Sequence, residues 1–158
     1  MCGQDFEWTS RNKGVVFGGI AGIFFGSGWW IFLNAASLHA SSTDPIPFSF
    51  YLPLIGQIVS FLMINCPQWS AISGDDSSAY NDPNRVLCIN RGIVMSGLFL
   101  EMTCLASSVY ILAGVYGEKD DAGFQPTDSI DGMLIFLSNL MVFLGTWLMR
   151  WGTVPVAE

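Results

Sequence analysis

Long apolar runs alternate with short polar segments along the whole chain. The hydrocarbon core of a bilayer is about 30 Å thick, so a helix that rises about 1.5 Å per residue needs roughly 20 residues to cross it. Four runs meet this requirement, at 14–38, 48–65, 92–116 and 130–149. They are continuously apolar and do not alternate, which favours helices over barrel strands. The pattern predicts an all-α fold, in which residues 1–158 form one polytopic membrane domain of four transmembrane helices.

Proline and glycine mark the breaks between these runs. Pro45 and Pro47 follow Asp44 in the first polar segment, and Pro53 falls one turn inside the second run. At that place a proline either kinks a helix or begins it. The longest polar segment, 66–91, has the Gly, Asp, Asn and Ser content of a loop.

The basic residues predict the orientation of the helices. Lys and Arg in short loops are retained in the cytoplasm, whereas acidic residues count for little. Five of the six basic residues fall before the first run, between the second and third, or after the fourth: Arg11, Lys13, Arg85, Arg91 and Arg150. The opposite side has only Lys119. Both termini and the 66–91 loop are therefore expected in the cytoplasm, with the Pro45 turn and the 118–128 loop lumenal or extracellular.

Composition and charge narrow the classes of partner. Hydrophobic residues make up 51% of the chain and charged residues 12%, well below the roughly one quarter that is usual for soluble proteins. The net charge is −7. Because phosphate binding needs clustered Lys and Arg, nucleic acid is not an expected partner, and no basic cluster for anionic lipid stands out. Membrane lipid is the expected surrounding.

The sequence offers no recognisable catalytic or metal-binding arrangement. The cysteines Cys2, Cys66, Cys88 and Cys104 show no CxxC spacing, and His39 is the only histidine. A zinc site, a redox dithiol or a Ser-His-Asp arrangement therefore has no support. We expect no enzyme activity, no metal and no cofactor.

Glu101 is an acid in the middle of the third run. An ionised side chain there costs at least roughly 2.5 to 3.5 kcal/mol on insertion scales, so the group should be neutral or paired. One interpretation is a proton- or cation-responsive site, or an anchor for a partner helix. The other is a residue that faces the bundle interior and hydrogen-bonds polar groups such as Asn34, Gln57 or Asn139.

Glycines recur every four residues in the first run, at Gly14, Gly18, Gly22 and Gly26. Such small-xxx-small strips let another backbone approach closely and drive helix association in lipid. The strip predicts a packing surface. Its partner helix belongs either to this chain or to another protein.

Several strings together resemble the transmembrane protein 50 family, which includes proteins of the vacuolar protein sorting 68 type. They are Phe24 to Ile31 with the Gly28-Trp29-Trp30 core, Asn34 to Ala36, Phe61 to Asn65 with Leu62-Met63-Ile64-Asn65, Gly74-Asp75 and Arg85-Val86. The resemblance spans nearly all of the chain. The family often has an acid at the position of Asn34, and the middle loop is longer and more acidic here than in animal members.

The resemblance implies an endosomal, Golgi or endoplasmic-reticulum membrane protein linked to late-endosome-to-vacuole trafficking. It also implies a hetero-oligomer with a second small four-helix membrane protein, and no enzyme activity. Two other functions remain open. The first is an accessory subunit of a large membrane complex. The second is a small transporter or proton-responsive channel that uses Glu101.

Overall fold

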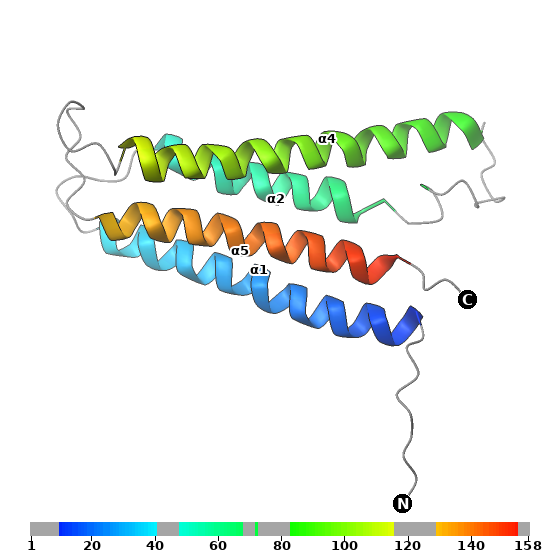
Figure 1. Ribbon diagram of the computed structural model, residues 1–158, viewed down its shortest axis with the longest axis horizontal. Coiled ribbons are helices and arrows are strands. Elements are labelled where there is room, and N and C mark those ends of the chain that lie inside the picture. The colour runs from blue at the N-terminus through cyan, green and yellow to red at the C-terminus, as the bar shows by residue number, and fades with distance from the viewer. Residues whose placement is uncertain (1–9, 41–47, 68–71, 73–82, 116–128, 155–158) are drawn as a thin grey trace, which may run out of the picture.

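Four helices lie side by side in the computed structural model, which describes residues 10–40, 48–67, 72, 83–115 and 129–154 (Figure 1). Helices long and apolar enough to cross a membrane cover Asn12–Ser37, Phe48–Asn65, Val86–Gly114 and Gly132–Thr153. The described residues contain no strand. The predicted all-α four-helix membrane bundle is confirmed.

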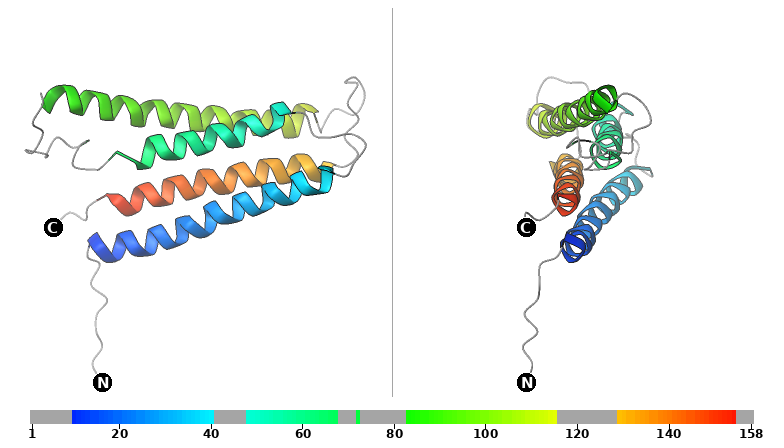
Figure 2. Two further views of the ribbon diagram at one scale, coloured as in Figure 1. Left: turned by 180° about the vertical axis from the view of Figure 1, so that it is seen from behind. Right: turned by 90° about the vertical axis from the view of Figure 1, so that its right-hand side faces the viewer.

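The bundle is built from two antiparallel pairs. Helix α1 (Ser10–Ala40) packs along α5 (Ser129–Thr153), and α2 (Leu52–Asn65) packs along α4 (Pro83–Tyr110). Both views in Figure 2 show these pairings. A short 3₁₀ turn, η1 (Phe48–Tyr51), leads into α2, and a π-helical turn, η2 (Ile111–Val115), continues α4. Helix α5 also contacts both α2 and α4, and these contacts join the two pairs.

Two helix starts show how proline acts in this chain. Pro53 lies in the first turn of α2, directly after the 3₁₀ turn, so it begins that helix and does not kink it. Helix α4 begins at Pro83, not near Gly92 as predicted, so part of the expected 66–91 loop is helical. Hydropathy locates the segment that enters hydrocarbon, and a proline-initiated helix can begin several polar residues before that segment. The Pro45 turn and the 118–128 loop lie outside the described residues.

Helices α1 and α5 meet through small residues spaced seven apart, a contact that we call the α1–α5 seam. On α1 these residues are Gly14, Ala21, Gly28 and Ala35, and on α5 they are Ser138, Gly145 and Gly152. A Cβ atom added at Gly28 would lie 2.8 Å from the Ser138 carbonyl oxygen, and one added at Gly145 would lie 3.1 Å from that of Ala21. Seven residues are two turns at a period of 3.5, so the small residues remain in one line and the two backbones approach closely.

Basic side chains hold one end of the bundle. The Lys13 ammonium donates a hydrogen bond of 3.1 Å to the carbonyl of Val154, beyond α5. The Arg150 guanidinium donates one of 3.2 Å to the carbonyl of Pro67, just beyond α2. Carbonyls at helix C-termini have no partner inside the helix, and a cation is a favourable donor for them.

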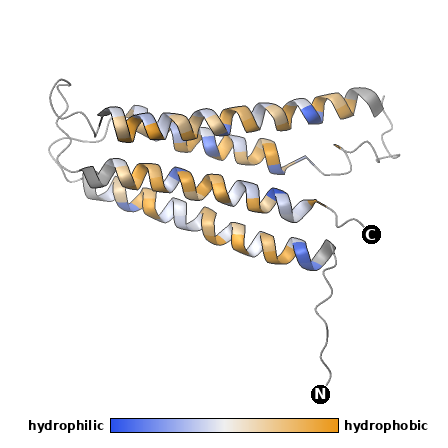
Figure 3. Cartoon of the chain, viewed as in Figure 1, coloured by the Kyte–Doolittle hydropathy of each residue, from blue (hydrophilic) through white to orange (hydrophobic). Residues whose placement is uncertain are grey.

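The bundle has large apolar side chains on its outside, as expected for helices in lipid, where apolar surface gains nothing by burial. Ile23, Trp30 and Phe99 are among the most exposed of them. Figure 3 shows apolar residues covering most of the length of every helix. The interior is notably polar, and its buried polar residues are Gln57, Ser60, Glu101, Ser108, Ser138, Asn139, Thr146 and Arg150.

Candidate functional site

The four predicted packing glycines of α1 do not share one environment. A Cβ atom at Gly14 would lie 3.5 Å from the carbonyl oxygen of Gly152, so this glycine contacts α5. At Gly18, Gly22 and Gly26 no atom of the described residues lies within 4 Å of such a Cβ. We call these three residues the outer glycine face. No described helix of this chain therefore lies against these three positions as closely as α5 lies against Gly14.

Helical geometry explains why the strip divides. Residues four apart on a helix with 3.6 residues per turn advance by about 40° around its axis. From Gly14 to Gly26 the strip therefore turns through about 120°, away from α5. The residues that meet α5 follow the seven-residue spacing of the α1–α5 seam. Sequence reasoning missed this seam, although the matching spacing of Ser138 and Gly145 in the fourth run, continued by Gly152 just after it, would have revealed it.

The outer glycine face continues into exposed polar and aromatic residues. Trp30 is 75% exposed, and Asn34 is exposed one turn further along α1. A shallow cavity of about 270 Å³ is lined by Trp30, Leu33, Asn34 and Ser37. Asn34 therefore lies on the outside of the bundle, so of the three candidate partners for Glu101 it is the one that does not lie in the interior. An exposed amide on a transmembrane helix is suited to hydrogen-bond a neighbouring helix.

Glu101 belongs to α4, and its side chain lies in the interior of the bundle, where α4 meets α2 and α5. It is 1% exposed, and Gln57 and Asn139 are both 0% exposed. The Thr146 side chain of α5 interacts with the Glu101 carboxyl, whereas the Gln57 amide and Asn139 Oδ1 have no hydrogen-bond partner among the described residues. The structure thus buries three of the four predicted intramembrane polar residues, but among the described residues neither Gln57 nor Asn139 Oδ1 hydrogen-bonds Glu101.

Hydroxyl groups around this polar interior donate to helix carbonyls. Ser60 donates to the carbonyl of Gln57 at 2.9 Å, and Thr146 donates to that of Val142 at 3.0 Å. The Asn139 amide donates to the carbonyl of Ile135 at 2.8 Å. These local bonds satisfy the hydrogens of the side chains, and the oxygens keep lone pairs that can accept.

The residues of the family-like strings have structural roles in the two helix pairs. Gly28 belongs to the α1–α5 seam, and Trp29 makes an edge-to-face contact with Phe32 at a centroid distance of 6.2 Å. Ile64 is buried, and its side chain and the Cβ of Met63 lie against Gly97 of α4. Leu62 is exposed. Asn65 donates to the carbonyl of Phe61 at 3.1 Å. Gly28, Met63 and Ile64 therefore help to hold the helix pairs together, and Trp30 and Leu62 lie on the outside.

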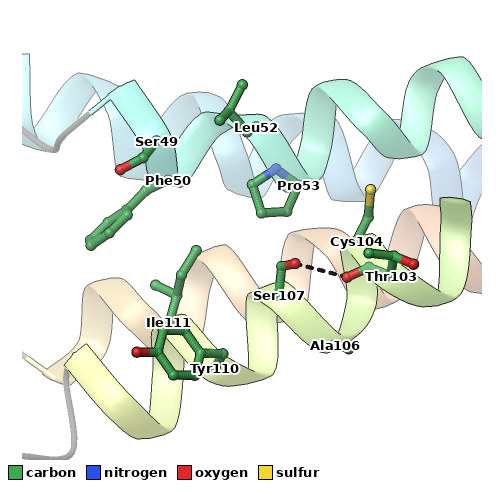
Figure 4. Close-up of a pocket in the computed structure, with 10 residues that line it drawn as sticks. All are labelled: Ser49, Phe50, Leu52, Pro53, Thr103, Cys104, Ala106, Ser107, Tyr110 and Ile111. Atoms are coloured by element: carbon green, nitrogen blue, oxygen red, sulfur yellow. Dashed lines mark hydrogen bonds between the residues drawn. The ribbon is translucent and has the colours of Figure 1, made fainter.

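An apolar cleft of about 570 Å³ separates the start of α2 from the second half of α4. Figure 4 shows its lining: Ser49, Phe50, Leu52, Pro53, Thr103, Cys104, Ala106, Ser107, Tyr110 and Ile111. The Ser107 hydroxyl donates to the Thr103 carbonyl at 2.8 Å, the dashed line in Figure 4. The Thr103 hydroxyl donates to the carbonyl of Phe99, also at 2.8 Å. With these hydrogens engaged, the cleft presents mainly apolar surface. No three His, Cys, Asp or Glu side chains in the described segments gather as metal ligands.

Comparison with known proteins places the chain in a family. A profile of the family described as "Uncharacterised protein family (UPF0220)" matches residues 2–154. A UPF0220 protein of Schizosaccharomyces pombe is 31% identical over 120 residues, which cover 70% of this chain and 68% of that protein. No solved structure matches. The match over nearly the whole chain and the yeast relative agree, and this protein belongs to the UPF0220 family.

Proposed function

We propose that this protein acts without enzyme activity, by associating with other integral membrane proteins in endosomal and vacuolar protein trafficking. The observation that supports association is the outer glycine face. Gly18, Gly22 and Gly26 lie in the first membrane span, and a Cβ atom added at any of them would meet no described atom within 4 Å.

Glycine on a lipid-facing surface offers no side chain to pack, and in aqueous hosts it lowers helix propensity by roughly 1 kcal/mol relative to alanine. Against a second helix, the same glycines let the backbones approach closely, so that dispersion and weak Cα–H hydrogen bonds add up along several turns. Asn34, exposed further along α1, adds a polar group that a partner helix can satisfy. The face therefore suits a transmembrane helix as partner.

The trafficking part of the proposal rests on the resemblance to the transmembrane protein 50 family through the Gly28-Trp29-Trp30 and Leu62-Met63-Ile64-Asn65 strings. It implies an endosomal, Golgi or endoplasmic-reticulum membrane and a second small four-helix protein as partner. The distribution of Lys and Arg further places both termini in the cytoplasm.

Copurification of full-length tagged protein from its own cells, in mild detergent and with quantitative mass spectrometry, tests the association. Gly22→Leu places a large side chain in the middle of the outer glycine face, where nothing in the chain obstructs it. The variant should remain folded and monodisperse but recover about tenfold less of its main partner, which corresponds to about 1.4 kcal/mol of binding free energy.

Gly92→Leu is the matched control, because Gly92 of α4 is also exposed with no described atom within 4 Å of an added Cβ. It should keep the partner. A Gly22→Leu protein that retains every wild-type partner would refute the role of the face. Recovery of one large stable complex in place of a small four-helix protein would favour an accessory subunit.

The orientation has its own test. Epitope tags on the two termini should both be reachable by antibody after selective permeabilisation of the plasma membrane. If both tags are protected, the proposed orientation is inverted, whereas protection of one alone is incompatible with four spans.

A further inference from the structure

The apolar cleft between α2 and α4 lies at membrane depth, because its two walls belong to the spans Phe48–Asn65 and Val86–Gly114. Beside the cleft the helices are in close contact, since a methyl group at Gly56 would collide with the sulfur of Cys104. Beyond this contact, the chain enters α2 through the 3₁₀ turn η1 and Pro53, whereas α4 continues into the π-helical turn η2. The two walls leave about 570 Å³ between them there (Figure 4).

Two hydroxyl groups lie at the end of the cleft that is nearer the membrane boundary. Ser49 is the second residue of its span and is exposed. Tyr110 is 71% exposed, and its ring lies over Gly114, the last residue of its span, where an added Cβ would be 3.3 Å from the ring. Deeper in the cleft, the hydroxyl hydrogens of Thr103 and Ser107 are donated to carbonyls of their own helix. The cleft is therefore polar at the boundary and apolar toward the middle of the membrane.

The size of the cleft suits a small molecule better than a helix. From Thr103 to Ile111 the cleft runs along α4 for about 12 Å, at 1.5 Å per residue. A helix about 10 Å wide would occupy about 900 Å³ over that length, so a cleft of 570 Å³ cannot seat one. Sites for small molecules typically measure about 300 to 1,000 Å³. At membrane depth, the small molecules that reach such a site are lipids.

We propose that the cleft binds one sterol, with its ring system between α2 and α4 and its hydroxyl group toward Ser49 and Tyr110. The ten residues that line the cleft, all within the described segments, carry no charge, so a phospholipid phosphate finds no counter-charge among them. A single sterol hydroxyl needs only a neutral donor and acceptor, which a serine or tyrosine hydroxyl supplies.

The shape of the cleft favours a rigid ligand over an acyl chain. The ring of Pro53 forms part of one wall and the buried Ile111 part of the other (Figure 4). A fused ring system loses little conformational freedom in a preformed cleft, whereas each rotatable bond of an acyl chain must be ordered. This inference is independent of the association through α1, because η1, α2, α4 and η2 alone line the cleft.

Photolabelling of the purified full-length protein in phosphatidylcholine nanodiscs tests the site. The probe is a sterol with a diazirine on its ring system, and peptide mass spectrometry locates the adducts. Adducts should concentrate on residues 49–53 and 103–111, and unlabelled sterol at about ten times its Kd should reduce them about tenfold. Adducts spread evenly over the four helices, or unaffected by the competitor, would overturn the proposal. Equal competition by diacylglycerol would show that the cleft takes an acyl chain, and would overturn it as well.

A pair of serine variants tests whether the cleft itself is the site. Ser107→Leu places a larger apolar side chain between the walls and should reduce the competed labelling at least about tenfold. Ser96→Leu is the matched control, because Ser96 is exposed on the same helix and does not line the cleft. Gel filtration in detergent checks that both proteins are folded. Equal labelling of the two folded variants would refute the cleft as the binding site.

A pair of tyrosine variants tests the orientation of the sterol. In the wild type, the sterol should compete about fivefold better than the same hydrocarbon without its hydroxyl group. Tyr110→Phe keeps the ring and should largely remove this preference. Tyr51→Phe should retain it, because Tyr51 packs edge-to-face against Phe32 and does not line the cleft. An unchanged preference in Tyr110→Phe would overturn the proposed position of the sterol hydroxyl.

Discussion

Helix α1 carries two sets of small residues that the structure uses differently. In the α1–α5 seam, Gly28 meets the backbone of α5 so closely that an added Cβ would lie 2.8 Å from a carbonyl oxygen. On the outer glycine face, an added Cβ at Gly22 would meet no described atom within 4 Å. The same residue type thus closes a helix pair on one side of α1 and leaves a surface open on the other.

The difference follows from spacing and from the partner helix. A seven-residue repeat keeps small residues nearly in line along a helix, and α5 supplies the complementary repeat at Ser138, Gly145 and Gly152. A four-residue repeat winds around the helix, so it faces a neighbour that crosses α1 at an angle, as in right-handed GxxxG pairs, and not α5, which runs along α1. Small residues in a membrane helix therefore indicate an internal contact when a second helix of the chain carries the matching repeat.

The largest effect that this comparison predicts is for Gly28→Leu. Its side chain would enter the space of the Ser138 carbonyl and Val142, neither of which is the far end of a flexible chain. Overpacking typically costs about 1 to 3 kcal/mol and can cost more where backbones must separate. The variant should fail to give a monodisperse peak in detergent gel filtration, whereas Gly22→Leu should match the wild type. A well-folded Gly28→Leu protein would show that the seam is looser than described.

A smaller effect is expected in the α2–α4 pair, where glycines meet side chains in place of backbone. A methyl group at Gly56 would collide with the sulfur of Cys104. Gly56→Ala should therefore lower the unfolding free energy by about 1 to 3 kcal/mol. Adding Cys104→Ala should recover much of that loss, and a double-mutant cycle of thermal unfolding measures the coupling. Additive effects of the two substitutions would contradict this contact.

The sequence predicts where the chain crosses the membrane better than it predicts where a helix begins or which side of it packs. Hydropathy located all four spans because about 20 apolar residues have few alternatives to crossing a bilayer. The start of α4 at Pro83 was missed because that end of the helix lies in polar sequence outside the hydrophobic run. The 1–9 and 155–158 ends lie outside the described residues, so the predicted cytoplasmic termini stay a prediction.

For the candidate site, residue type was more informative than position. Glu101 was expected in the interior because a charged group facing lipid is costly, and the structure buries it. Asn34 was one of three candidate partners for it and lies outside, since an amide costs less against lipid and the sequence alone does not fix the rotation of α1. That three hydroxyl and amide side chains, those of Ser60, Asn139 and Thr146, donate to their own helices could not be read from the sequence.

The smallest predicted effect concerns Gly14, which begins both repeats of α1. Its added Cβ would lie 3.5 Å from the Gly152 carbonyl oxygen, an ordinary van der Waals distance, so Gly14→Ala should change the unfolding free energy by no more than about 0.5 kcal/mol. Across the same contact, an added Cβ at Gly152 would lie 2.8 Å from Phe17 Cβ, so Gly152→Ala should be the more destabilising by about 1 kcal/mol. Thermal unfolding of the two variants side by side measures the difference. Because both place one methyl group at the same end of the seam, equal melting temperatures would mean that the helix ends separate freely and that the seam is held by Gly28 and Gly145 alone.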